Sequence, residues 1–171
     1  MSDTRIVATR LGALALAVTD VQRRYTPKTL ARAPQDAALL NTVVQTPGLM
    51  TEELTEILGL THSGTVRAID RLVSSGHAVR QSHARDGRAV GVHPTDAGTD
   101  LVQNMQDEIH KALGSVFVDL DEEQLDTVAS VIDFIVMGFV GDRRTSDRIC
   151  RMCDEHICRP ETCPAERFDR A

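Results

Sequence analysis

Apolar residues recur at helical spacing through most of the chain. Between residues 4 and 25 they alternate steps of three and four, which predicts a helix with a narrow apolar seam. Seams of this kind often pair with another helix or another chain. A second helix is expected from Pro34, and two long helices follow residue 95. Asp121 and Gln124 have capping-box spacing, which places the start of the last long helix.

Shorter elements occupy the middle of the chain. Residues 51–58 and 62–75 each carry apolar positions at helical spacing, and Gly59 lies between them. Residues 78–83 and 88–92 then read as two short strands of a hairpin. Two short helices joined by a tight turn and followed by a hairpin form a winged helix-turn-helix. The predicted fold class is therefore mainly α with a small β-hairpin wing, in which the winged helix-turn-helix core is flanked by long helices.

The charge distribution changes this picture. The chain has a net charge of −6, which by itself disfavours a nucleic-acid partner. Residues 61–93, however, hold five arginines and four histidines against two aspartates. A basic segment is thus set in an acidic chain, and that segment coincides with the second short helix and the hairpin. Local charge of this kind is the usual electrostatic signature of a DNA-binding surface.

The second short helix can lie in the major groove, which admits a helix and displays distinguishable base edges. Ser63 and the helix N-terminus suit a phosphate or a base edge, and Arg67 suits a guanine or a phosphate. The predicted outward face consists of His62, Ser63, Val66, Arg67, Asp70 and Arg71.

The hairpin tip is expected at residues 85–87. It would carry Arg85 and Arg88 on a projecting loop, where arginines can enter a narrow minor groove. We expect Asp86 to pair with Arg88 or Arg71 and to fix its direction.

Five short motifs in order resemble the DNA-binding core of the MarR regulators. They are the L-x-x-x-L-G-L turn, R-x-I-D-R-L, S-G-H-x-V-R, D-x-R-A-V and T-D-x-G, all within residues 51–101. With the flanking helices, the resemblance covers about 140 residues. By resemblance, Arg88 takes the wing-arginine position of the family and Asp86 the position of its supporting acid. Gly64 and Val66 depart from the family's usual recognition helix and put the pattern of base contacts in question.

The resemblance implies a homodimer in which the first and last helices interlock. Such a dimer binds double-stranded DNA at a pseudo-palindromic operator, typically as a repressor, and responds to a small molecule or a redox signal. The expected segments are a dimerisation helix (1–33), the winged helix-turn-helix domain (34–94), two further dimerisation helices (95–142) and a cysteine-rich tail (143–171).

Two other functions compete with DNA binding. Winged helices can bind proteins, but such copies usually lack a basic wing tip. The tail cysteines could serve a thiol oxidoreductase, but the CxxC step at Cys150 lacks a strand-to-helix setting. Paired catalytic carboxylates and a phosphate-binding glycine loop are missing from the sequence. We therefore expect a regulator and not an enzyme.

All four cysteines lie in the tail, at Cys150, Cys153, Cys158 and Cys163. Their spacing equals that of a zinc knuckle with cysteine in the third place. A tail this polar cannot fold on an apolar core of its own, and a bound metal would supply the missing stability. The leading prediction is a structural Zn²⁺ held by all four thiolates. An iron–sulfur cluster is the main alternative, and metal-free thiol switching and inert thiols remain open.

A metal directly after the last dimerisation helix is expected to lock helix ends across the dimer, or to alter the spacing of the recognition helices. The sequence shows no signal peptide and no apolar run long enough for a membrane span. We therefore expect a cytoplasmic protein, where thiols stay reduced, and not a disulfide-linked tail.

Overall fold

The structure is a computed structural model that describes residues 3–31, 33–83, 86–159, 161 and 163–166. Its elements, in chain order, are α1 (Thr4–Tyr25), α2 (Pro34–Gln45), β1 (Leu49–Met50), α3 (Thr51–Leu58), α4 (His62–Ser74), β2 (Ala78–His83), β3 (Asp86–Pro94), α5 (Asp96–Gly114), the 3-10 helix η1 (Ser115–Phe117), α6 (Glu122–Phe139) and α7 (Arg143–Cys150).

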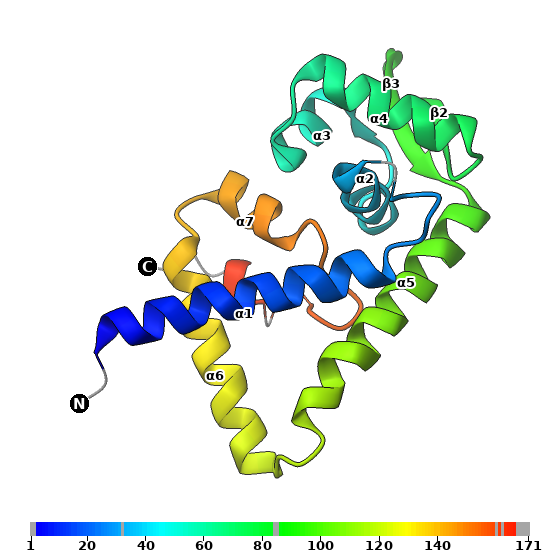
Figure 1. The fold of residues 1–171 in the computed structure, drawn as a ribbon. Helices are drawn as coiled ribbons and strands as arrows, with labels where there is room; N and C mark the ends of the chain where they lie inside the picture. The colour runs from blue at the N-terminus through cyan, green and yellow to red at the C-terminus, as the bar shows by residue number, and fades with distance from the viewer. Residues whose placement is uncertain (1–2, 32, 84–85, 160, 162, 167–171) are drawn as a thin grey trace.

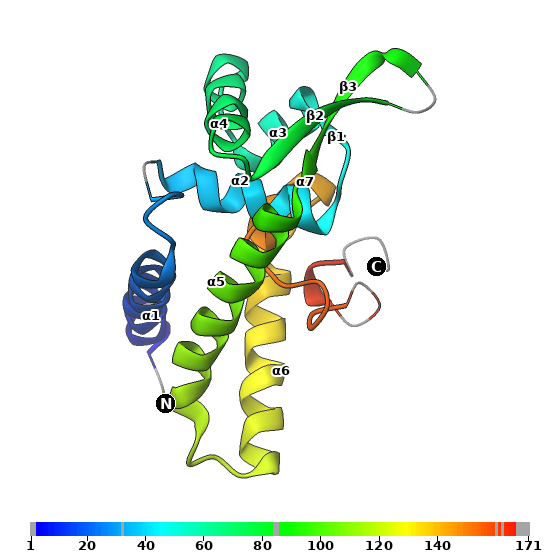
Figure 2. The ribbon, with the colours of Figure 1, turned by 90° about the vertical axis from the view of Figure 1, so that its right-hand side faces the viewer.

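The winged helix-turn-helix elements gather at one end of the molecule (Figure 1). From that end α5 runs to the far tip, where the chain turns back into α6, while α1 crosses alongside. The β2–β3 hairpin projects away from the body (Figure 2). This arrangement confirms the predicted mainly α fold with a small wing. Of the helices in the described part of the chain, none combines the length and apolar character needed to cross a bilayer.

Side-chain caps define where several helices begin. The Thr61 hydroxyl accepts a hydrogen bond from the Gly64 amide at 3.1 Å, which starts α4. Asp121 and Gln124 form a reciprocal capping box at the start of α6, with distances of 2.9 and 3.1 Å. The box confirms the prediction made from the spacing of these two residues. Such caps satisfy amides that the first helical turn leaves unpaired.

The wing is part of a three-stranded antiparallel sheet in the order β1-β3-β2. The short strand β1 was not predicted; it pairs through Leu49 with Val92 of β3. Position 91 of β3 requires glycine, because the strand passes close to the backbone just before β1. A Cβ atom at Gly91 would lie 2.5 Å from the Gly48 carbonyl oxygen. β3 is also longer than the predicted 88–92.

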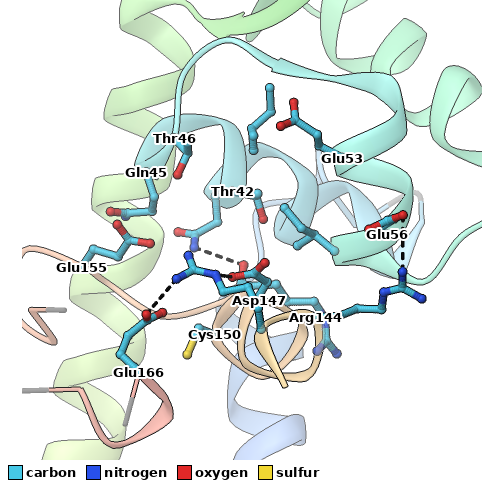
Figure 3. A pocket seen from close by; sticks show the side chains of 15 residues that line it. Thr42, Gln45, Thr46, Glu53, Glu56, Arg144, Asp147, Cys150, Glu155 and Glu166 are labelled. Carbon is cyan, nitrogen blue, oxygen red and sulfur yellow. Dashed lines mark hydrogen bonds and ion pairs between the residues drawn. The ribbon is translucent and has the colours of Figure 1, made fainter. Parts of the chain in front are cut away.

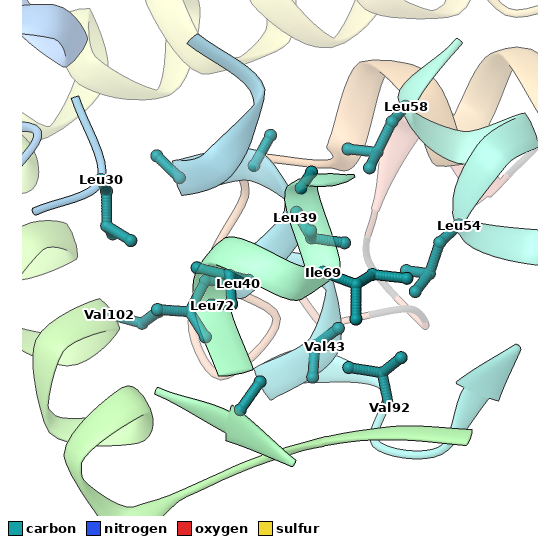
Figure 4. Packing of buried hydrophobic residues seen from close by; sticks show 14 of the residues in the cluster. Leu30, Leu39, Leu40, Val43, Leu54, Leu58, Ile69, Leu72, Val92 and Val102 are labelled. Carbon is teal, nitrogen blue, oxygen red and sulfur yellow. The ribbon is translucent and has the colours of Figure 1, made fainter. Parts of the chain in front are cut away.

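The apolar core surrounds α2, which lies between α4, α5 and the sheet (Figure 4). Leu39, Leu40 and Val43 of α2 are fully buried, as are Ile69 and Leu72 of α4. Burial of each such side chain contributes roughly 1.5–3 kcal/mol. This shared core fixes the orientation of α4 relative to the rest of the domain.

Two of the long helices have no buried residue within this chain. Neither α1 nor α6 buries a single side chain, although both carry the apolar seams expected from the sequence. The exposed apolar side chains on them are Ile6, Val7, Leu14, Leu16, Leu125, Val131, Ile132, Phe134, Met137 and Phe139.

The tail departs from the sequence-based expectation, because it begins with an eight-residue helix, α7. Asp142 caps this helix by accepting a hydrogen bond from the Thr145 amide at 2.7 Å. α7 packs against α3 and buries Ser146. The chain therefore folds back onto the helix-turn-helix after α6.

Candidate nucleic-acid interface and cysteine site

The turn between α3 and α4 is built around Gly59, whose φ of 63° lies in the left-handed region. The Leu60 amide bonds to the Thr55 carbonyl at 3.2 Å, which closes the turn. The Thr55 and Thr65 hydroxyls are 2.9 Å apart and join the two helices directly. Left-handed backbone favours glycine, so this position fixes the angle between the helices.

The outward face of α4 carries most of the predicted contact residues. His62, Ser63, Arg67 and Asp70 are exposed, and Val66 is half-buried. Among the residues that the structure describes, Arg67 makes no salt bridge. The structure therefore presents this arginine to solvent in the middle of the helix, between a polar N-terminal turn and an acidic residue.

Arg71 has a structural contact that the sequence did not indicate. Its guanidinium donates two hydrogen bonds to the carboxylate of Asp36, at 2.8 and 2.6 Å. The Asp36 side chain is only 2% exposed, whereas that of Arg71 is 38% exposed. The hydrogen bond to Asp36 raises the pKa of Arg71. The pair ties α4 to α2.

Asp70 also has a partner, because Arg80 of β2 donates a hydrogen bond to its carboxylate at 2.8 Å. Both side chains are solvent-accessible. The pair connects the outward edge of α4 to the base of the wing. Asp70 can therefore support the position of the wing relative to α4. Its partner, Arg80, lies on the strand β2 and not at the wing tip.

The tip of the wing is only partly described. Asp86 pairs with His83 at the end of the hairpin, after a register irregularity between Ser82 and His83. The predictions for Arg85 and for the side chains of Asp86 and Arg88 lie outside the described residues. The backbone nevertheless places Arg88 near the projecting end of β3 (Figure 2).

The four cysteines lie close together at the end of the chain. Cys163 is buried and the other three are half-buried, and all four are free thiols. Interaction between the Cys150 and Cys153 thiols raises the pKa of Cys150 and lowers that of Cys153, and burial raises the pKa of Cys158 to about 11.

In the described part of the chain, no group of three or more His, Cys, Asp or Glu side chains is arranged to hold a metal ion.

Two buried amides hold the turn that contains Cys150 and Cys153. Asn41 of α2 and Gln106 of α5 are 1% and 3% exposed, and both donate hydrogen bonds to tail carbonyls. The sequence analysis missed both residues. Gln106 carried a usable signal, because it interrupts the apolar stripe of α5 with a polar side chain at a core position.

A cavity of about 380 Å³ is lined by residues of α7, α2 and α3 (Figure 3). Cys150 is among its lining residues, and the ion pair between Arg144 and Glu56, at 3.5 Å, lies at its rim. Another ion pair, between Arg143 and Glu166 at 2.8 Å, joins α7 to the last described turn of the tail. Most of the charged groups around this cavity are therefore paired.

Together, the tight turn, the exposed face of α4 and the hairpin define a winged helix-turn-helix protein. Solved structures share this fold. YusO from Bacillus subtilis matches with a TM-score of 0.64 at 17% identity, covering 79% of this chain and 97% of its own. A MarR family protein from Bacillus stearothermophilus gives 0.64 at 18% identity, with 79% and 96% coverage. Apo MarR from E. coli gives 0.56 at 20% identity, with 73% and 96% coverage.

Residues 32–89, from the start of α2 into β3, match the sequence profile of the MarR family. This match covers about a third of the chain, and the solved structures share the winged helix-turn-helix fold with it. The resemblance noted from the sequence motifs is confirmed.

Proposed function

We propose that the chain binds double-stranded DNA as a homodimer at a pseudo-palindromic operator, acts as a repressor and works in the cytoplasm. The observation that carries this proposal is the outward face of α4, where Arg67 is exposed beside Ser63 and the N-terminus of the helix. A helix N-terminus with exposed hydroxyl and guanidinium groups suits phosphates and base edges. The core holds the opposite face of α4, so the exposed face is rigidly presented.

The dimer is supported by the two uncovered helices. Isolated apolar side chains on a surface are ordinary, but α1 and α6 each expose a continuous series of them and bury none. A second copy of the chain would cover both helices. Two copies related by a two-fold axis would present two α4 helices to two half-sites.

The proposal is tested by binding to a duplex selected from a random-sequence pool. Arg67→Ala should weaken binding roughly tenfold and reduce the slope of log K against log salt by about 1, because one phosphate or base contact is lost. Arg5→Ala is the matched control. Its side chain is 93% exposed at the N-terminal end of α1, far from α4 (Figure 1). Equal affinities and equal slopes for both variants would remove α4 from the interface.

A second variant tests the contribution of the wing to DNA binding. Arg88→Ala should also weaken binding at least roughly tenfold and lower the salt dependence, if its side chain enters the minor groove. A wing variant with wild-type affinity and slope would confine recognition to α4.

We also propose that the tail cysteines bind one Zn²⁺ per chain. The support is chemical, since the four thiols lie near one another at the end of the chain. Such thiols can exchange their protons for a cation, and thiolates are preferred zinc ligands. Arg151 and Arg159 each follow a cysteine directly in the sequence and would offset part of the negative charge of a four-thiolate site. An iron–sulfur cluster uses the same ligands and is the alternative.

Metal content separates these cofactors. Anaerobically purified protein should be colourless with about one zinc per chain, and replacement of all four cysteines by serine should abolish zinc binding. A brown protein that absorbs near roughly 400 nm would establish the cluster instead. Protein that takes up neither metal would refute both assignments.

A further inference from the structure

Three consecutive backbone carbonyls of the cysteine turn are held by side chains from the domain core. The Asn41 amide donates to the carbonyls of Arg151 and Cys153, at 3.2 and 2.9 Å. Gln106 donates to the Met152 carbonyl and to the Asn41 side-chain oxygen, both at 2.9 Å. The turn between the first two thiols is therefore docked on α2 and α5.

This docking depends on the conformation of the turn. Asn41 and Gln106 are almost fully buried, so their amides have no water to replace a lost carbonyl. A buried donor without a partner is costly, which makes one arrangement of the turn strongly preferred. A change at Cys150 or Cys153 that moves the turn must break this network.

The other face of α7 lies on the helix-turn-helix itself. The Arg148 guanidinium lies directly over Gly59, in the space that a side chain at that position would fill. Gly59 ends α3 and makes the turn into α4, and a cation at the C-terminal end of a helix is stabilising. Arg144 adds an ion pair to Glu56 one turn earlier, visible at the rim of the cavity (Figure 3).

Cys150 is the last residue of α7, so the helix connects the cysteine site to the DNA-binding turn. Its last residue is a candidate metal ligand, and its Arg148 lies over the glycine turn between α3 and α4. A displacement of the cysteine turn would therefore move the arginines over Gly59. No second chain is needed for this connection.

We propose that the cysteine site regulates DNA binding within one chain, by holding α7 against the α3–α4 turn. In this mechanism, Asn41 and Gln106 position the turn between the thiols, and Arg148 transmits its state to Gly59. The intact site stabilises the DNA-binding arrangement of α4. This inference rests on the proposed DNA-binding function. From the sequence, the cysteine site was expected to act on DNA binding through the dimerisation helices, whereas the mechanism proposed here acts inside one protomer.

The test measures the affinity of the full-length protein for a selected duplex, by fluorescence anisotropy. Wild-type protein loaded with Zn²⁺ is compared with protein stripped by a chelator and with the variant in which all four cysteines are serine. Loss of the cysteine site should weaken binding by at least roughly fivefold, the lower end of ordinary allosteric coupling. Arg148→Ala, a change at an exposed residue, should abolish this difference, while Lys111→Ala on α5 should retain it.

A second measurement does not require DNA. The amides of Gly59 and Leu60 are hydrogen-bonded in the turn, at 3.3 and 3.2 Å, so their hydrogen exchange reports on its stability. Exchange of both should be faster in the all-serine variant than in the wild type.

The outcomes are separable. Equal affinity and equal exchange with and without the cysteines would overturn the regulation, whatever metal the tail holds. A response that Arg148→Ala leaves intact would overturn the route through Gly59. If no form binds DNA, the proposed function fails, and the regulation of DNA binding fails with it.

Discussion

At the residue scale, the arginines of the helix-turn-helix divide into two roles. Arg71 is bound to the buried carboxylate of Asp36, and Arg80 is bound to Asp70. Arg67 presents its guanidinium to solvent. The first two therefore stabilise the position of α4, whereas Arg67 is available to a ligand. Local charge identified the basic surface but could not distinguish these roles.

The two ion pairs should differ in their contribution to stability. Asp36→Ala should lower the free energy of unfolding by about 1–3 kcal/mol, because Arg71 loses a buried acceptor that holds two hydrogen bonds. Asp70→Ala breaks an exposed pair and should cost at most about 1 kcal/mol. Urea denaturation of both variants measures the difference. Equal losses would show that the Asp36 pair has no special structural role.

The Asp36–Arg71 contact could not be predicted from the sequence. The two residues are 35 positions apart and meet only because α2 and α4 pack against each other. The same holds for Asn41 and Gln106, which are 65 positions apart. Residue spacing identifies faces of single helices, but it does not show which polar groups meet across a core.

At the element scale, the features with local causes were predicted well. The capping box at α6 was predicted from the spacing of Asp121 and Gln124, and its short-range hydrogen bonds are present. β1 is only two residues long and exists through its pairing with β3. α7 is polar and has no apolar stripe, and its one sequence signal was the Asp142 cap. β1 and α7 both depend on tertiary contacts, which the spacing of apolar residues along the chain does not predict.

Close packing between α5 and the start of the wing makes a second prediction. A Cβ atom at Gly98 would clash with the backbone carbonyl oxygen of His77, which cannot rotate away. Gly98→Ala should therefore destabilise the fold by roughly 1–3 kcal/mol. Gly114, at the other end of the same helix, has open space around the corresponding position.

Gly114→Ala is the matched control and should be neutral or stabilising by up to about 1 kcal/mol, because alanine favours the helix. Thermal unfolding of the two variants, followed by circular dichroism, gives the comparison. If Gly98→Ala proved as stable as Gly114→Ala, the close approach between α5 and the wing would be wrong.

At the scale of the whole molecule, an acidic protein presents a basic recognition surface at one end and uncovered apolar helices elsewhere. The net charge of −6 thus does not describe the surface proposed to bind DNA. α1 and α6 bury no residue fully within the chain, and Phe134 of α6 is 78% exposed. Both features are explained by a dimer that places two copies of α4 on one duplex.

The most direct test of this account is hydroxyl-radical footprinting of a selected duplex, with the binding stoichiometry measured on the same DNA. The wild type should bind as two chains per duplex and protect two symmetric half-sites, separated by about one helical turn of 10–10.5 base pairs or a multiple of it. Phe134→Asp should sediment as a monomer and lose the paired protection. A single unsymmetric footprint from one bound chain, unchanged by Phe134→Asp, would contradict the account.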